Sequence, residues 1–144
     1  MKTARFFPVL LAITAFFIHC KHQQQYTGDN LPAEALYFGN GGGFTGAETA
    51  YALLENGQLF KWTDKASGTE VLTGFSRKAA RKLFESAQKQ EILKTEFMHP
   101  GNMYSFIELR QNGREFHRIA WGDRDHPVDP KIKELHEALM QLTN

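Results

Sequence analysis

Hydrophobic and polar residues alternate on both sides of two Asn-Gly pairs in this chain. Residues 51–62 alternate about Asn56-Gly57, and residues 104–121 alternate about Asn112-Gly113. Asn-Gly between alternating runs is a strong signal for a β-hairpin, because a type I′ turn needs positive φ at both central residues. The pattern therefore predicts two β-hairpins, each closed by a two-residue turn.

A two-residue turn also predicts which residues face each other across each hairpin. Pairing outward from the first turn places Tyr51 opposite Trp62, and pairing outward from the second places Tyr104 opposite Trp121. Each hairpin is then expected to carry a cross-strand Tyr–Trp pair. In the first hairpin the expected core face consists of Tyr51, Leu53, Phe60 and Trp62.

Apolar residues at helical spacing follow each hairpin and predict two helices. Ser76 is a suitable N-cap for the first helix, and Asp129 followed by Pro130 marks the start of the second. Short extra strands are expected at residues 36–38 and 69–72. We therefore expect one α+β domain over residues 34–144: an antiparallel sheet of two Asn-Gly hairpins plus short extra strands, with two helices on one face, in the order ββα–ββα.

The N-terminal residues predict export and a lipid anchor. A basic start is followed by an apolar run over residues 6–18, which is too short to span a bilayer and has the length of a signal-peptide core. Cys20, the only cysteine, follows this run after one residue, His19. The arrangement resembles a bacterial lipoprotein signal, in which the cysteine becomes the lipidated first residue. We expect residues 1–19 to be a signal peptide and residues 20–33 to be the lipidated cysteine and a polar tether, with a soluble secreted form as the alternative.

The charge balance excludes general attraction to polyanions. The chain has a formal net charge of +1, but Lys2 and Arg5 lie in the predicted signal peptide. The rest of the chain has 15 Lys and Arg against 16 Asp and Glu. Nucleic acid is therefore not an expected partner, and anionic lipid is not expected to attract the domain as a whole.

Two segments form the candidate binding surface. The glycine-rich run 39–46 predicts a bend that either cradles an anion with backbone N–H groups or makes room for a neighbouring element. The steric explanation is favoured, because neither a helix nor a lysine follows as in phosphate loops. Phe44 is expected either to anchor a partner or to plug the core. The candidate residues are Gly41, Gly42, Gly43 and Phe44 in the bend, and Arg77, Lys78, Arg81 and Lys82 at the start of the first helix, which face phosphate head groups, an acidic partner or only solvent.

No known catalytic motif is present, so an enzyme is not the expected class. The rival hypothesis is a small hydrolase or ligand-processing enzyme built from His99, His126, Asp123 and Asp125. Its requirement is that these residues converge on one reacting atom in a pocket. No metal or cofactor is expected, because the 123–129 segment lacks the glycine and distal glutamate of a calcium loop and zinc sites favour more imidazole or thiolate.

Three runs carry a resemblance to a known group of proteins. GGGFTGAETAYALLENGQLFK, PGNMYSFIEL and WGD resemble an uncharacterised family of small Bacteroidota-type lipoproteins. The resemblance covers most of the chain after the tether and implies an exported outer-membrane or cell-surface lipoprotein, with a periplasm-facing position as the alternative. It implies no catalytic residues. The expected function is thus a lipid-anchored accessory protein that binds, or structurally supports, an envelope protein or the cell wall.

Overall fold

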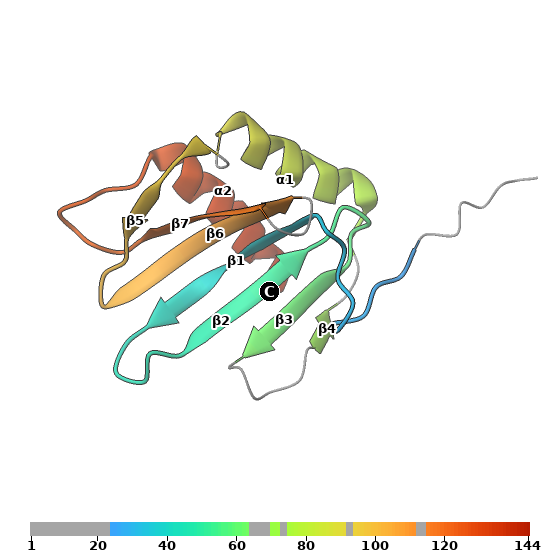
Figure 1. The fold of residues 1–144 in the computed structure, drawn as a ribbon, viewed down its shortest axis with the longest axis horizontal. Coiled ribbons are helices and arrows are strands. Elements are labelled where there is room, and N and C mark those ends of the chain that lie inside the picture. The colour runs from blue at the N-terminus through green and yellow to red at the C-terminus, as the bar shows by residue number, and fades with distance from the viewer. Residues whose placement is uncertain (1–23, 64–69, 73–74, 92–93, 112–114) are drawn as a thin grey trace, which may run out of the picture.

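The computed structural model describes residues 24–63, 70–72, 75–91, 94–111 and 115–144 of the 144-residue chain. A seven-stranded sheet forms one layer, and two helices cover one of its faces (Figure 1). The α+β class is confirmed. The predicted signal peptide and Cys20 lie outside the described residues. In chain order the elements are β1 (Ala35–Gly42), β2 (Glu48–Leu53), β3 (Leu59–Thr63), β4 (Glu70–Leu72), α1 (Arg77–Lys89), β5 (Phe97–His99), β6 (Met103–Gln111), β7 (Glu115–Trp121), α2 (Pro130–Met140) and the 3₁₀ turn η2 (Gln141–Thr143).

The strands are arranged in the order β4-β3-β2-β1-β6-β7-β5, so β1 lies at the centre between the two hairpins. Neighbouring strands are antiparallel except β5 and β7, which are parallel. The sheet is therefore mixed, where a purely antiparallel sheet was predicted. The short extra strands expected at residues 36–38 and 69–72 are present as β1 and β4, whereas β5 was not predicted.

The first hairpin is shifted by one residue from the predicted register. Leu53 pairs with Leu59, and Tyr51 pairs with Lys61. In the turn, the Leu54 N–H donates to the carbonyl of Gln58 at 2.9 Å, and only Gly57 of the Asn-Gly pair has positive φ, at 92°. This is a three-residue loop with glycine in the left-handed position, so the predicted type I′ turn is wrong.

The second hairpin shows the same shift. Ile107 pairs with Ile119 and Ser105 pairs with Trp121, while the predicted turn at Asn112-Gly113 lies outside the described residues. A one-residue shift moves every side chain of a strand to the other face relative to its partner. The predicted Tyr51–Trp62 and Tyr104–Trp121 pairs are therefore wrong. The predicted core face is divided: Tyr51 and Leu53 belong to the main core, whereas Phe60 and Trp62 belong to a separate, smaller cluster.

Strand β1 continues through the glycines, where the sequence predicted that it ends at Phe38. A Cβ at Gly39 would lie 2.0 Å from the Thr49 carbonyl oxygen and 3.1 Å from the Phe106 ring. A Cβ at Gly41 would lie 2.5 Å from the hydroxyl oxygen of Tyr104. The absent side chains thus leave room on β1 for two aromatic rings of β6.

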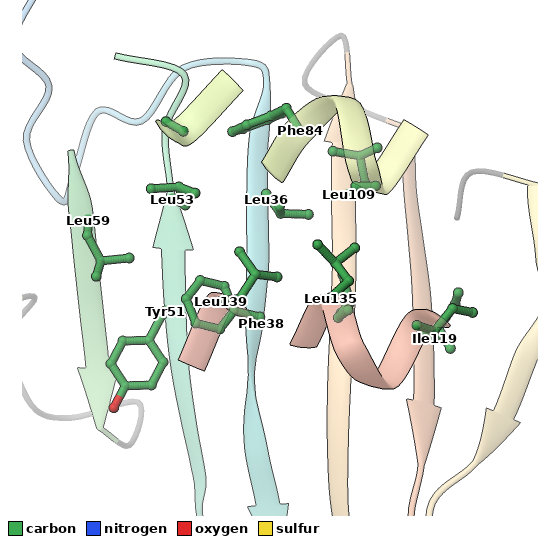
Figure 2. Close-up of a cluster of buried hydrophobic side chains, with 14 residues drawn as sticks. Leu36, Phe38, Tyr51, Leu53, Leu59, Phe84, Leu109, Ile119, Leu135 and Leu139 are labelled. Atoms are coloured by element: carbon green, nitrogen blue, oxygen red, sulfur yellow. The ribbon is translucent and has the colours of Figure 1, made fainter. Parts of the chain in front are cut away.

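The main core lies between the sheet and the helices, as Figure 2 shows. Helix α1 contributes Phe84, and α2 contributes Leu135 and Leu139. Both predicted N-caps are confirmed: Ser76 Oγ accepts from the Ala79 N–H at 3.1 Å, and Asp129 Oδ1 accepts from the Lys131 N–H at 2.9 Å. The caps fix where each helix begins. Burial of each apolar side chain that the helices contribute to the core adds about 1.5–3 kcal/mol to the stability of the fold.

The opposite face of the sheet carries aromatic rings and a charged network. The Arg118 guanidinium lies 3.9 Å from the Phe106 ring centroid and pairs with Glu48 and Glu108. Arg110 pairs with Glu108 and lies 4.0 Å from the Tyr37 ring. Glu108 is buried, and a buried carboxylate is costly unless it is paired. The guanidinium groups of Arg110 and Arg118 balance its charge.

Candidate functional site

The loops at the two ends of the sheet carry different groups of predicted site residues. The Phe44 end consists of the loops 43–47, 100–102 and 122–129, which the Gly43–Asn102 hydrogen bond (2.7 Å) and the Asp123–His99 hydrogen bond (3.1 Å) hold together. The Asn56 end consists of the loop 54–58 and the first turn of α1. In Figure 1 the β1–β2 and β7–α2 loops both lie on the left, away from the start of α1.

The predicted binding surface is therefore two surfaces. Its glycines and Phe44 lie at one end of β2, and Arg77, Lys78, Arg81 and Lys82 lie at the other. The six residues of β2 span about 20 Å at the usual rise per residue. A single small-molecule ligand is therefore too short to contact both the glycine loop and the basic residues of α1.

An open cleft of about 350 Å³ lies at the Phe44 end, beside the C-terminal end of α2. Asn40 is a polar residue of its lining, and the Asn40 Oδ1 accepts a hydrogen bond from the Ser105 hydroxyl at 2.8 Å. The lining residues are Asn40, Gly41, Gly42, Ala47, Thr49, Tyr51, Met103 and Met140. Two of the predicted residues, Gly41 and Gly42, thus line the cleft.

Phe44 is fully exposed at the tip of the β1–β2 loop. Of the two expectations for Phe44, the one in which the ring plugs the core is therefore wrong. Positive φ at Gly43 (77°) and Gly46 (64°) shapes the loop on both sides of the ring. Met103, also exposed, lies next to Gly43, whose Cβ would be 3.2 Å from the methionine sulfur. The Phe44 end therefore presents apolar side chains to solvent beside the cleft.

His136 lies behind the cleft and has a structural role. Its Nε2 is 3.0 Å from the Gly39 carbonyl oxygen, an acceptor, so Nε2 carries a hydrogen and donates. Its ring also meets Trp121 edge to face at 5.1 Å. Burial lowers the pKa of His136, against a smaller opposing effect of the hydrogen bond to Gly39. The ring is thus held neutral in the folded protein, and its hydrogen bond to Gly39 joins α2 to strand β1.

The basic residues of α1 are exposed at the Asn56 end. The first turn of the helix contains no acidic residue, so these cations oppose the positive end of the helix dipole. The Phe75 N–H donates to the Gly57 carbonyl at 2.7 Å and fastens the start of α1 to the 54–58 loop. The arrangement concentrates positive charge at this end of the domain.

The described chain also enters the domain at the Asn56 end. The Gln24 carbonyl accepts a hydrogen bond from Asn56 Nδ2 at 2.7 Å. The side-chain amide of Gln58 accepts from the Tyr26 N–H and donates to the Tyr26 carbonyl. Tyr26 and Leu31 pack against the small apolar cluster around Phe60. Residues 24–31 of the predicted tether therefore dock on the sheet.

Three of the four residues of the rival enzyme hypothesis converge. His99, Asp123 and His126 each offer a donor atom, and these atoms all lie within 4.8 Å of one another. The Asp125 carboxylate is outside this group, although its backbone N–H donates to Asp123 at 3.0 Å. That hydrogen bond, followed by one with His126, lowers the pKa of Asp123. The cleft described above is lined by other residues, so the three groups converge without sharing that cavity.

Comparisons with known proteins assign no family to the chain. No family model matches it, and no curated protein matches it. Among the helices in the described part of the chain, none is long and apolar enough to cross a bilayer.

Proposed function

We propose that the chain is a lipid-anchored accessory protein of the cell envelope that binds a partner protein through its Phe44 end. The proposal includes export by residues 1–19, lipid attachment at Cys20, and membership of the Bacteroidota-type lipoproteins that the sequence motifs resemble. No enzymatic activity is proposed for it. The observation that carries the proposal is the separation of the two ends: the chain enters at the Asn56 end, and Phe44 projects at the opposite one.

The anchored side follows from chain length. Gln24 is four positions after Cys20, and four residue-to-residue steps reach at most about 14 Å. A lipid on Cys20 therefore keeps the Asn56 end near the bilayer surface. The exposed cations of α1 lie at this same end and are suited to phosphate head groups, which attract each basic residue near an anionic surface by about 1 kcal/mol.

The binding side follows from exposed apolar surface. Burying a phenylalanine side chain contributes about 1.5–3 kcal/mol, and aromatic and methionine residues are enriched in protein interfaces. Phe44 and Met103 provide both types beside the cleft. We propose a protein rather than a cell-wall polymer as the partner, because the exposed side chains beside the cleft are a phenylalanine and a methionine, types that are enriched in protein interfaces.

We also propose that the domain is built from two ββα units, β2–β3–α1 and β6–β7–α2. In this layout β1 joins the two hairpins at the centre of the sheet, while β4 and β5 extend its edges. Support comes from the strand order, in which the hairpins flank β1 on either side.

The Cys20→Ser variant is expected to leave the membrane fraction. Without the thiol there is no attachment point for the lipid, and the remaining attraction of the α1 cations is too weak to hold the protein. The measurement is cell fractionation combined with incorporation of labelled fatty acid. Unchanged membrane flotation and labelling of the variant contradict the anchor.

The Phe44→Ser variant is expected to keep the membrane anchor and to lose its partner. The loss of phenyl burial corresponds to a reduction of about tenfold or more in recovery after crosslinking and pull-down from the native envelope. The melting temperature should not change, because the ring is fully exposed. Val71→Ser is the matched control, since Val71 is an exposed apolar residue on the edge strand β4. Equal recovery from wild type and Phe44→Ser, or recovery of cell-wall polymer alone, contradicts the proposed protein partner.

A further inference from the structure

A compact group of possible metal ligands lies at the Phe44 end, outside the cleft. His99 is the last residue of β5, and Asp123 follows two residues after the end of β7. Because β5 and β7 are parallel, with His99 paired to Trp121, their C-terminal ends lie side by side. The Asp123 N–H donates to the His99 carbonyl at 3.1 Å, so a backbone hydrogen bond joins two of the three residues directly.

The positions of these residues are set by the surrounding chain. The Phe97 ring meets the His99 ring edge to face at 4.8 Å, and the Asp125 N–H holds one carboxylate oxygen of Asp123 at 3.0 Å. A Cβ on Gly101 would lie 2.6 Å from the Gly122 carbonyl oxygen, so the two loops are in close contact. The group therefore joins the end of β5 to the loop that follows β7.

The donor set suits a transition-metal ion. Two imidazoles and one carboxylate can each supply a donor atom, and these atoms lie within 4.8 Å of one another. Imidazole nitrogen is a ligand for zinc, copper, nickel and iron, whereas calcium and magnesium take oxygen ligands. Three protein ligands with an open position are typical of zinc sites that bind water or substrate. We propose that His99, Asp123 and His126 bind one divalent transition-metal ion, with zinc as the best-fitting ion and one position left for water or a further ligand.

Binding requires a defined rearrangement. With zinc–ligand bonds of 2.0–2.2 Å, the ligand atoms of a tetrahedral site lie about 3.3–3.6 Å apart. The rings of His99 and His126 are stacked at 4.1 Å with an interplanar angle of 9°, so their nitrogens do not point at a common centre. His126 has an exposed side chain and can rotate out of the stack, exchanging its 2.8 Å hydrogen bond with Asp123 for a shared metal.

The test is a titration of the full chain in detergent, stripped of metal by a chelator, with zinc chloride. We expect one zinc ion per chain, a higher melting temperature with zinc, and a tetrahedral visible spectrum with cobalt. Changes in residues that only support a ligand weaken metal sites about 10–100-fold, so His99→Ala and His126→Ala should each weaken binding at least tenfold. Asp125→Asn is the matched control: it removes a carboxylate from the same loop outside the donor group and should bind zinc as wild type does.

Three results overturn the proposal: no saturable zinc binding by the wild-type chain, binding that persists in both histidine variants, or an equal response to calcium. In those cases the His126–Asp123 hydrogen bond serves only to hold the loop before α2. The readout is metal binding itself, so it does not depend on the lipid anchor or on a partner at Phe44.

Discussion

Gly57→Ala is expected to lower the free energy of unfolding by about 3 kcal/mol or more. The residue has φ of 92°, where a side chain costs roughly 1–2 kcal/mol. The added Cβ would also lie 1.9 Å from the Phe75 carbonyl oxygen, which belongs to the backbone leading into α1. Because the Gly57 carbonyl accepts the Phe75 N–H, the clash cannot be relieved without moving the start of the helix. Urea denaturation of wild type and variant gives the difference.

Gly46→Ala separates the two contributions. Gly46 also has positive φ, at 64°, but a Cβ there would have no atom within 4 Å. Only the backbone cost applies, so the expected loss is about 1 kcal/mol. Equal losses for the two variants would show that the contact between the 54–58 loop and α1 does not constrain the turn.

The same turn shows how far the sequence determines the fold. Asn56-Gly57 correctly marked a hairpin, but a two-residue type I′ turn and a three-residue loop both place glycine in the left-handed position after asparagine. The local signal therefore does not fix the loop length. The register follows from contacts that are distant in sequence, among them the packing of Gly57 against Phe75.

The continuation of β1 through its glycines could not be predicted for a similar reason. Glycine weakens an isolated strand, so the run after Phe38 indicated a stop. In the folded protein Gly39 and Gly41 lie at the centre of the sheet, and the rings that fill their space, Phe106 and Tyr104, come more than 60 residues later. By contrast, the caps Ser76 and Asp129 were predictable because capping is decided within one helical turn.

The sequence grouped His99 with Asp123, Asp125 and His126 in the rival enzyme hypothesis, but it could not establish which of them meet. His99 meets Asp123 and His126 only because β5 pairs in parallel with β7, and no local pattern in the sequence indicates that pairing. The glycine bend and the cations of α1 were both candidates for contact, and the order of the strands places them at opposite ends. The proposed function depends on that separation, because it assigns one end to the membrane and the other to a partner.

Substitutions in the charged network on the helix-free face of the sheet are expected to lower the free energy of unfolding about as much as substitutions in the core. Arg118, on β7, reaches across β6 and the glycines of β1 to Glu48 on β2. Glu48 also accepts from the Tyr104 hydroxyl at 2.8 Å. Burial, followed by this hydrogen bond, raises the pKa of Tyr104 and keeps its hydroxyl protonated as the donor. The glycines thus make room for a clamp that joins strands from both hairpins.

Arg118→Met is expected to lower the free energy of unfolding by about 2–3 kcal/mol. Methionine keeps much of the aliphatic contact with Phe106 but leaves Glu48 and Glu108 without their shared cation. Breaking a buried ion pair costs about 3–5 kcal/mol, and the value is reduced here because the side chains of Arg118 and Glu48 are 27% and 33% exposed. Chemical denaturation of the variant measures the loss.

A double-mutant cycle with Glu48→Gln identifies the cause. If Arg118 acts by balancing the Glu48 carboxylate, neutralising Glu48 in the Arg118→Met background costs less than it does in wild type, with a coupling energy of about 1 kcal/mol. The coupling should also fall at high salt, because both groups are partly exposed. Strictly additive losses would mean that Arg118 does not act through Glu48, and that its stabilising effect comes from stacking on Phe106 at 3.9 Å and from its pair with Glu108.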